Sequence, residues 1–210
     1  MAWPPAVQSQ ADGRTNVAIK QTAQKAILTW NSFNVGRQTT VHFDQRGGNQ
    51  NDGSNNWIAL NRIQDPSGVP SQILGQIQAE GTVYLLNRNG IVFGAGSQVN
   101  TRSFLASSLD LFSSDTAASD NAFLQGGISG QAAVSGFLTT DGVLAHLRQY
   151  GDVIIEQGAS ITTGAQGFAL VAAPRVANAG AIVTDDGQAI LAAGLQFNNK
   201  AGSSNGGALQ

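Results

Sequence analysis

The chain has 210 residues, 11 basic and 13 acidic side chains and a formal net charge of −2, so it lacks the basic excess with which general nucleic-acid-binding proteins neutralise phosphates. It has no cysteine, which excludes disulfides, thiol nucleophiles and cysteine metal sites. Charged residues are only 11% of the chain, and 20 Gln and 16 Asn provide polar surface in their place. The 41% of apolar residues can bury the core of one large domain or two small ones.

Residues 1–15 begin with Met-Ala-Trp-Pro-Pro, without the charged and apolar regions of a signal peptide. Either the protein stays inside the cell, or this is a mature or trimmed chain. In the second case, residues 1–15 are the lead segment of a mature chain whose signal peptide is absent from this sequence. No window approaches the roughly 18 apolar residues of a membrane-spanning helix.

Residues 16–45 differ in residue pattern from the rest of the chain, and we predict that they form an N-terminal β cap. Val17 and Ile19 alternate with polar residues, and residues 21–28 fit either a helix or a strand. Trp30 and Phe33 then stand beside a predicted turn. Residues 46–56 are rich in Gly and Asn and are predicted to be a mobile polar loop.

An internal repeat follows the cap. Residues 167–173 (GFALVAA) align with residues 187–193 (GQAILAA) at an offset of 187 − 167 = 20, and residues 81–86 align with residues 101–106 at the same offset. Short alternating runs at residues 153–155, 159–161 and 181–183 are typical of strands bounded by turns. Residues 113–130 break this spacing and are expected to leave the repeat; residues 199–210 are expected to be a flexible end or linker.

Short strands recurring about every 20 residues favour an all-β solenoid over a β-sandwich, because hairpins do not maintain such a register. In a solenoid each coil stacks on the next at roughly 4.8 Å. Neutral polar side chains stack well at that spacing, whereas like charges repel. The low charge content therefore fits a narrow coil with an apolar interior.

The sharpest local motif is the turn Asn87-Arg88-Asn89-Gly90, followed by Ile91, between two apolar strands. A type I turn prefers Asn or Asp at its first position and Gly at its fourth. The residues alone therefore indicate a well-formed solenoid corner, and we expect Asn87 and Asn89 to act mainly in the turn, with recognition of a partner second.

Four ordered motifs, at residues 30–36 (WNSFNVG), 58–63 (IALNRI), 81–94 (GTVYLLNRNGIVFG) and 104–110 (FLASSLD), resemble the two-partner secretion domain of the filamentous haemagglutinin family. This domain is also called the haemagglutination activity domain. The resemblance covers residues 16–198. It implies one right-handed parallel β-helix with an N-terminal cap and extra-helical strands.

The resemblance also implies a function. The family's domains lead large exported proteins through the periplasm to the surface of Gram-negative bacteria, and their partner is a TpsB-type outer-membrane β-barrel transporter with periplasmic POTRA domains. A role in transporter recognition is carried over to the turn, and a secondary role to the earlier motifs. The turn residues are Asn87, Arg88, Asn89, Gly90 and Ile91; the secondary candidates are Asn31, Phe33, Asn34, Gly36 and Asn61.

Two departures from the family pattern bear on these residues. The family's turn is Asn-Pro-Asn-Gly-Ile, and Arg88 stands where the family has Pro, which lowers local rigidity but keeps the turn. The family's earlier Asn-Pro-Asn-Leu tetrapeptide is missing, and residues 55–58 are a weak substitute. The residues that contact the transporter are left open.

Enzymatic function is not expected, and no cofactor or metal is predicted. The chain has no Gly-x-Ser-x-Gly, no phosphate-binding loop ending in Lys-Ser/Thr and no His pair at metal-ligand spacing. His42 and His146 are interpreted as structural, and the carboxylates are too scattered for polysaccharide cleavage. Residues 47–52 hold one Asp, too little for a calcium site.

We therefore expect a monomeric, non-catalytic secretion domain that the transporter recognises, by β-augmentation for example, and that acts as a folding template outside the cell. The rival hypothesis is an adhesin module that binds glycan or a host surface through stacked Asn, Gln and Thr with exposed aromatic residues. Whether the exported protein is an adhesin, a haemolysin or a contact-dependent toxin is not encoded in these residues.

Overall fold

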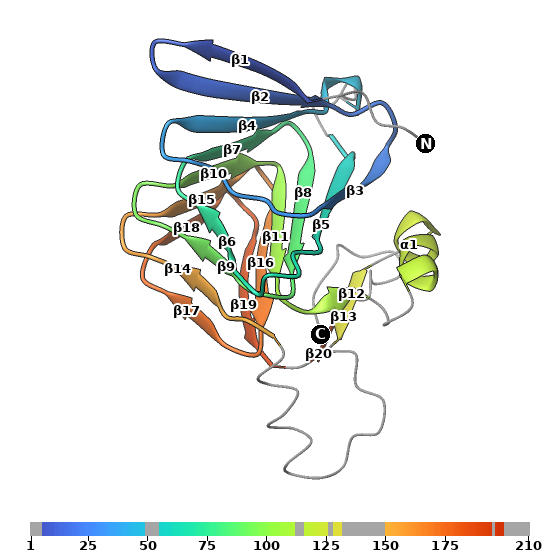
Figure 1. Ribbon diagram of the computed structural model, residues 1–210. Helices are drawn as coiled ribbons and strands as arrows, with labels where there is room; N and C mark the ends of the chain where they lie inside the picture. Colours follow the sequence, from blue (N-terminus) through green and yellow to red (C-terminus); the bar gives the residue numbers. More distant parts are fainter. Residues whose placement is uncertain are drawn as a thin grey trace.

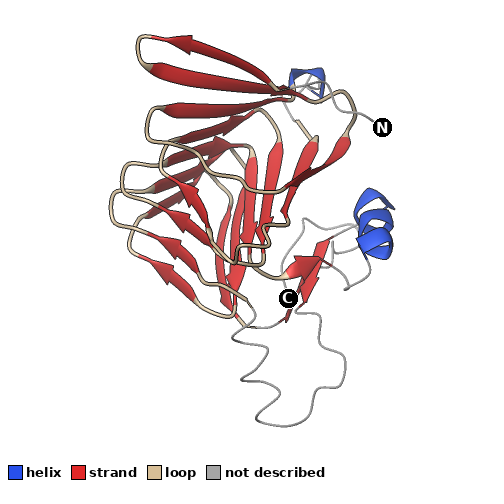
Figure 2. Cartoon of the chain, in the orientation of Figure 1, coloured by secondary structure: helices blue, strands red, loops and turns tan. Residues whose placement is uncertain are grey.

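A computed structural model describes residues 6–48, 55–111, 116–125, 128–131, 150–194 and 196–199. The described residues wind as a coil of short strands in parallel ladders, and this confirms the predicted parallel β-helix (Figure 1). Strands dominate the described residues, which include one α-helix on the side of the coil (Figure 2). The described parts of the predicted loop and C-terminal segment are residues 46–48, 55–56 and 199; residues 49–54 and 200–210 lie outside the described residues.

Three sheets form the faces of the coil. Sheet A consists, in spatial order, of β1 (Val7–Ala11), β2 (Arg14–Lys20), β4 (Thr39–Asp44), β7 (Gln76–Ala79), β10 (Gln98–Thr101), β15 (Ser160–Thr163) and β18 (Ala181–Thr184). Sheet B consists of β19 (Gln188–Ala193), β16 (Phe168–Ala173), β11 (Ser103–Ser107), β8 (Thr82–Asn87), β5 (Ile58–Ile63) and β3 (Lys25–Trp30). Sheet C consists of β17 (Val176–Asn178), β14 (Val153–Ile155), β9 (Ile91–Phe93) and β6 (Ser71–Ile73).

The register of sheet B confirms one predicted alignment and corrects the other. Leu170 pairs with Ile190 at the predicted offset of 20. Tyr84 pairs with Leu105, an offset of 21, so the alignment of residues 81–86 with residues 101–106 was wrong by one position. The corner between sheets A and B has two residues before β8 and one before β11, which shifts the frame. A slip of one residue exchanges the faces of a strand, so this error would turn the core outward.

The interior of the coil is filled by alternate residues of every strand. Ile77, Val99 and Ile161 stack on one another in sheet A with no exposed surface. In β18 the inward residue is Ile182, which pairs with Ile161, whereas Val183 faces outward and is exposed. The interior is therefore as narrow and apolar as the repeat predicts.

A second apolar cluster lies outside the coil, on the outer face of sheet B. Tyr84, Leu86 and Leu105 are buried there against Phe123 of α1 (Thr116–Gln125). Burial raises the pKa of the Tyr84 hydroxyl. A strand buried on both faces has an uninterrupted apolar run, and residues 83–86 are such a run. The coil is thus more than the single-cored spiral expected from the sequence.

The segment between β11 and β14 leaves the coil, as residues 113–130 were expected to do. It contains α1 and the strands β12 (Asp110–Leu111) and β13 (Ile128–Gln131), and β20 (Gln196–Asn199) joins β13 to form an antiparallel outer sheet. Lys25 donates hydrogen bonds to the carbonyls of Phe123 and Leu124 at the C-terminal end of α1, where a cation is favoured. These contacts tie the helix to the first coil.

Candidate functional site

The turn predicted at residues 87–90 is present and hydrogen-bonded. Gly90 N donates to Asn87 O at 2.8 Å, and Asn89 N donates to Asn87 Oδ1 at 2.9 Å. Neither Arg88 nor Asn89 has a positive φ, as a type I turn requires. Gly90 has φ = +99°, and a Cβ there would lie 2.5 Å from Asp152 O, so the turn needs glycine on both counts.

Both asparagine side chains of the turn are used inside the molecule. Asn87 is buried and its Nδ2 donates to Ser71 Oγ at 2.9 Å. Asn89 Nδ2 donates to the backbone oxygen of Asp65 at 2.7 Å. The two amides therefore hold the connection between β5 and β6 against the turn, which fits the structural role expected for them.

Arg88 and Ile91 face opposite ways. Ile91 is fully buried in the coil, and its N–H donates to Asp152 O at 3.0 Å. Arg88 is exposed, and its guanidinium carbon lies 4.9 Å from the centre of the Tyr150 ring. Of the five turn residues, Arg88 is the one in the exposed class. That a transporter contacts this side chain stays a prediction.

The secondary candidates lie around the same strand, β6. Asn34 Oδ1 accepts a hydrogen bond from Gln72 N at 2.8 Å, and the turn holds the neighbouring Ser71. Gly36 O accepts from Thr39 N at 2.8 Å in the turn that leads into β4. Asn31 is exposed beside this segment. The structure therefore brings Asn34 and Asn87, which are 87 − 34 = 53 positions apart in the sequence, to the same short strand.

Phe33 and Asn61 meet at a third residue, Trp30. Phe33 is buried with its ring edge-to-face with Trp30, the centroids 5.4 Å apart. Asn61 has no exposed surface; its Oδ1 accepts from Trp30 Nε1 at 3.0 Å and its Nδ2 donates to Tyr84 O at 3.2 Å. A buried amide with both ends paired positions the cap on the coil, and no surface remains for a partner.

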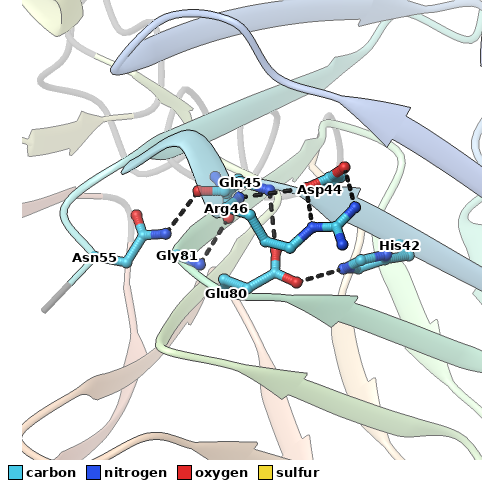
Figure 3. A network of polar contacts seen from close by, with 7 residues as sticks. All are labelled: His42, Asp44, Gln45, Arg46, Asn55, Glu80 and Gly81. Atoms are coloured by element: carbon cyan, nitrogen blue, oxygen red, sulfur yellow. Dashed lines mark hydrogen bonds and ion pairs between the residues drawn. The ribbon is translucent and has the colours of Figure 1, made fainter. Parts of the chain in front are cut away.

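Sequence analysis missed a buried polar network at the corner between sheets A and B (Figure 3). Its centre is Gln45, which has no exposed surface. Gln45 Oε1 accepts from Gly81 N at 2.9 Å, and its Nε2 donates to Gln21 Oε1 at 2.8 Å and to Thr82 O at 3.2 Å. The Gln45 side-chain amide thus pairs with the backbone N–H of Gly81 and the backbone oxygen of Thr82, as a neighbouring strand would.

The network continues on either side of Gln45. Asn55 Nδ2 donates to Gln45 O at 2.7 Å, so one end of the predicted mobile loop is fixed and buried. Glu80 accepts from Gln45 N through Oε2, and its Oε1 lies 2.8 Å from His42 Nε2. Hydrogen bonds from the Arg46 side chain lower the pKa of the Asp44 carboxyl to about 2.

Alternation along the strands could have revealed this network. Val41 and Phe43 point inward, so period two also places Gln45 inward. In the same way Ile19 predicts an inward Gln21. An amide at two inward positions, each at the end of a strand, is the signal that sequence analysis did not use.

The outer face of sheet A carries the stacked amides that the glycan hypothesis invoked. Gln76 Nε2 lies 3.5 Å from Gln98 Oε1, and Thr40 Oγ1 lies 3.4 Å from Gln76 Oε1. The exposed aromatic residues of that hypothesis are not found where burial is described: every aromatic side chain there is buried or half-buried. No helix in the described ranges is long and apolar enough to cross a membrane.

Comparisons with known proteins agree on one family. The sequence profile of the TPS secretion domain matches residues 4–210. A heme/hemopexin-binding protein of Haemophilus influenzae is 36% identical over 95 residues, 45% of this chain and 9% of that protein; its counterpart from strain Rd is 33% identical over 95 residues, 45% of this chain and 10% of that protein. The matched region is thus about a tenth of each relative's length.

A solved structure has the same fold. The crystal structure of the HMW1 secretion domain from Haemophilus influenzae superposes with a TM-score of 0.66 at 23% identity, covering 94% of this chain and 44% of that one. The similarity between the two structures shows that they share the fold, and the sequence profile of the family covers residues 4–210 of this chain. The chain therefore belongs to the TPS, or two-partner secretion, family of secretion domains.

Proposed function

We propose that this domain is recognised by a dedicated outer-membrane transporter with periplasmic POTRA domains and then acts as the folded template on which the rest of an exported protein winds at the cell surface. The TPS family supplies the setting, since its exported proteins reach the surface of Gram-negative bacteria with an outer-membrane partner. The proposed role contains no catalytic step.

The observation that carries the template role is the difference between the two ends of the coil. At the first coil, the buried amides of Gln21 and Gln45 hydrogen-bond to each other, and Gln45 also accepts from Gly81 N. Among the described strands, the edge strands of both ends pair with one neighbour each: β1, β3 and β6 at the first end, and β17, β18 and β19 at the last. The two ends therefore differ in the side chains that they present. Leu191 is 46% exposed although it lies in register with Val171 of the core. Buried polar side chains thus fill the corner at the first end, and an apolar side chain stays exposed at the last.

The last coil presents a branched apolar side chain on the inward side of each face. These are Val176, Ile182 and Leu191, which stack on Val153, Ile161 and Val171 of the preceding coil. A further coil with apolar residues in these three positions would complete their burial, at about 25 cal/mol per Å² of apolar surface. Adding a coil to a finished one avoids the unfavourable first nucleus of a solenoid, so folding can bias movement outward.

Paired substitutions on the last coil test this proposal in the full exported protein. Leu191→Asp places a charge where the next coil would stack, and Val183→Asp places one at a similarly exposed position, 53%, on the outer face. The isolated domain should tolerate both, since surface substitutions change stability by about 0.5 kcal/mol. In the full protein only Leu191→Asp should lower secretion and the protease resistance of the segment that follows, because a buried unpaired charge is costly.

Equal secretion of the two variants, with equal protease resistance downstream, would contradict the template role. Recognition is measured separately, as binding of the domain to the transporter's purified periplasmic fragment. Leu191→Asp should leave that binding unchanged.

A further inference from the structure

The free edge of sheet A at its N-terminal end is strand β1, in a part of the chain that sequence analysis took as a lead segment. All five residues of β1 are exposed, Val7 at 66%, and among the described strands β1 pairs with β2 alone. None of the five is charged, and none is Lys or Pro, the residues that usually protect an edge from pairing. The edge is therefore open to main-chain pairing with another strand.

The β1–β2 hairpin is also the most local strand pairing in the described part of the chain. Its turn, Asp12-Gly13, has φ values of +52° and +72°, the positive pair of a type I′ turn. Its strands pair residues at most 11 positions apart, Val7 with Ala18, whereas every parallel pair of the coil joins residues 20 or more apart. Local pairs close faster than distant ones, so the hairpin can form while the coil is still extended.

We propose that the transporter's periplasmic domain binds this chain by β-augmentation, by pairing one of its own strands with β1. This rests on the proposed function and names its contact surface. A further coil cannot occupy this edge, since coils add at β17, β18 and β19, at the opposite end of the stack. Main-chain pairing needs no charge complementarity, which suits an uncharged strand.

The register states which backbone groups do the pairing. In a hairpin with a two-residue turn, the flanking residues Ala11 and Arg14 form the hydrogen-bonded pair, and alternate residues then face away from β2. Gln8 and Gln10 therefore direct their N–H groups to the free edge. Proline is tolerated in an edge strand where its missing N–H faces solvent, so these two positions accept it with the hairpin intact.

The experiment compares Gln8→Pro/Gln10→Pro with the matched variant Gln8→Ala/Gln10→Ala, which removes the same side chains but keeps the N–H groups. Each domain is tested for binding to the purified periplasmic POTRA fragment of the transporter encoded with this chain. We expect the proline variant to bind at least tenfold more weakly, the alanine variant to bind as the wild type does, and both to keep the wild-type melting temperature.

A measurement on the wild type guards against misfolding of the proline variant. Adding the POTRA fragment should slow hydrogen exchange of the Gln8 and Gln10 amides at least tenfold. Equal binding by both variants, loss of binding in both, or unchanged exchange would each overturn the proposal. So would a dimer of the domain that the proline variant dissociates without weaker POTRA binding. If the wild type does not bind the fragment, transporter recognition itself fails; if it binds and only the predicted differences are missing, the hairpin assignment alone fails.

Discussion

The first coil of this solenoid ends in side-chain amides, and the last coil ends in apolar side chains. At the first, Gln21 and Gln45 occupy inward positions at the ends of their strands and satisfy backbone groups that a preceding coil would otherwise pair. At the last, Leu191 and Ile182 occupy inward positions within their strands and stay partly exposed. The contrast teaches that a solenoid end is closed by polar groups that use up its hydrogen bonds, and stays extendable where apolar residues remain.

Among the tests of this contrast, the substitution Gln45→Ala should have the largest effect on stability. The change leaves Gly81 N–H, Thr82 O and the Gln21 side chain without their partner and opens a cavity, so we expect a loss of about 4 kcal/mol in the free energy of unfolding. Urea unfolding measures it. Gln98→Ala, on the exposed face of sheet A, is the control and should change stability by less than about 0.5 kcal/mol. A loss below 1 kcal/mol for Gln45→Ala would show that the network does not close the end.

Glycine substitutions at the corner before β7 and after the last strand of the coil should differ nearly as much. A Cβ at Gly75 would lie 2.1 Å from Gly36 O and 2.3 Å from Thr39 O, both backbone atoms, so Gly75→Ala should cost about 3 kcal/mol. At Gly194 a Cβ would meet nothing within 4 Å, and Gly194→Ala should leave stability unchanged or raise it by about 0.5 kcal/mol. Thermal unfolding of the two variants measures this difference, and similar melting temperatures would mean that the corner at Gly75 is no more tightly packed than the end of the last coil.

Substitutions in the turn at residues 87–90 can distinguish a structural role from a role in transporter recognition. Asn87→Ala removes the partner of Ser71 Oγ and of Asn89 N, and should cost about 2 kcal/mol. Arg88→Ala removes an exposed stacking contact and should cost about 0.5 kcal/mol. Secretion measured beside stability should fall in proportion to stability in both. Lost secretion at unchanged stability would identify a residue that the transporter touches.

The smallest expected effect is electrostatic. Because the folded-state pKa of Asp44 is lowered to about 2, from 3.8, this carboxylate stabilises the closed end above pH 4, and the contribution is lost as pH falls toward 2. Its partner Arg46 is 68% exposed, so solvent screening limits the effect to about 1 kcal/mol. Asp44→Asn should flatten the fall of stability between pH 4 and pH 2 by that amount, measured by denaturant titration at low salt. An identical slope in the two proteins would assign the acid sensitivity elsewhere.

Much of the coil was predictable because its strands repeat. Residues 167–173 and 187–193 show the stacking directly, and Asn87-Arg88-Asn89-Gly90 predicts its turn from local rules alone. The register of β8 on β11 was not predictable from an assumed constant repeat, because corner lengths vary and a single residue at a corner exchanges the two faces of the next strand.

Other features depend on contacts that a repeat does not encode. Helix α1 is held by Lys25 and by an ion pair between Arg62 and Asp120, far apart in sequence. The roles of Gln45 and Asn61 follow from the partners that the fold brings to them. The β1–β2 hairpin is a different case, since Asp12-Gly13 is a sequence signal that the assignment of residues 1–15 to a lead segment overlooked.

The segment between β11 and β14 leaves the stack of coils, and the strands that follow it continue the same ladder register. Ser107 pairs with Ala172 across 65 positions, where the previous coil needed 21, so 65 − 21 = 44 extra residues are accommodated without disturbing the ladder. The entropy of closing the longer connection grows only logarithmically, by about 1 kcal/mol. A corner of this kind is a point where evolution, or a protein engineer, can graft new modules onto the scaffold while the scaffold itself stays the same.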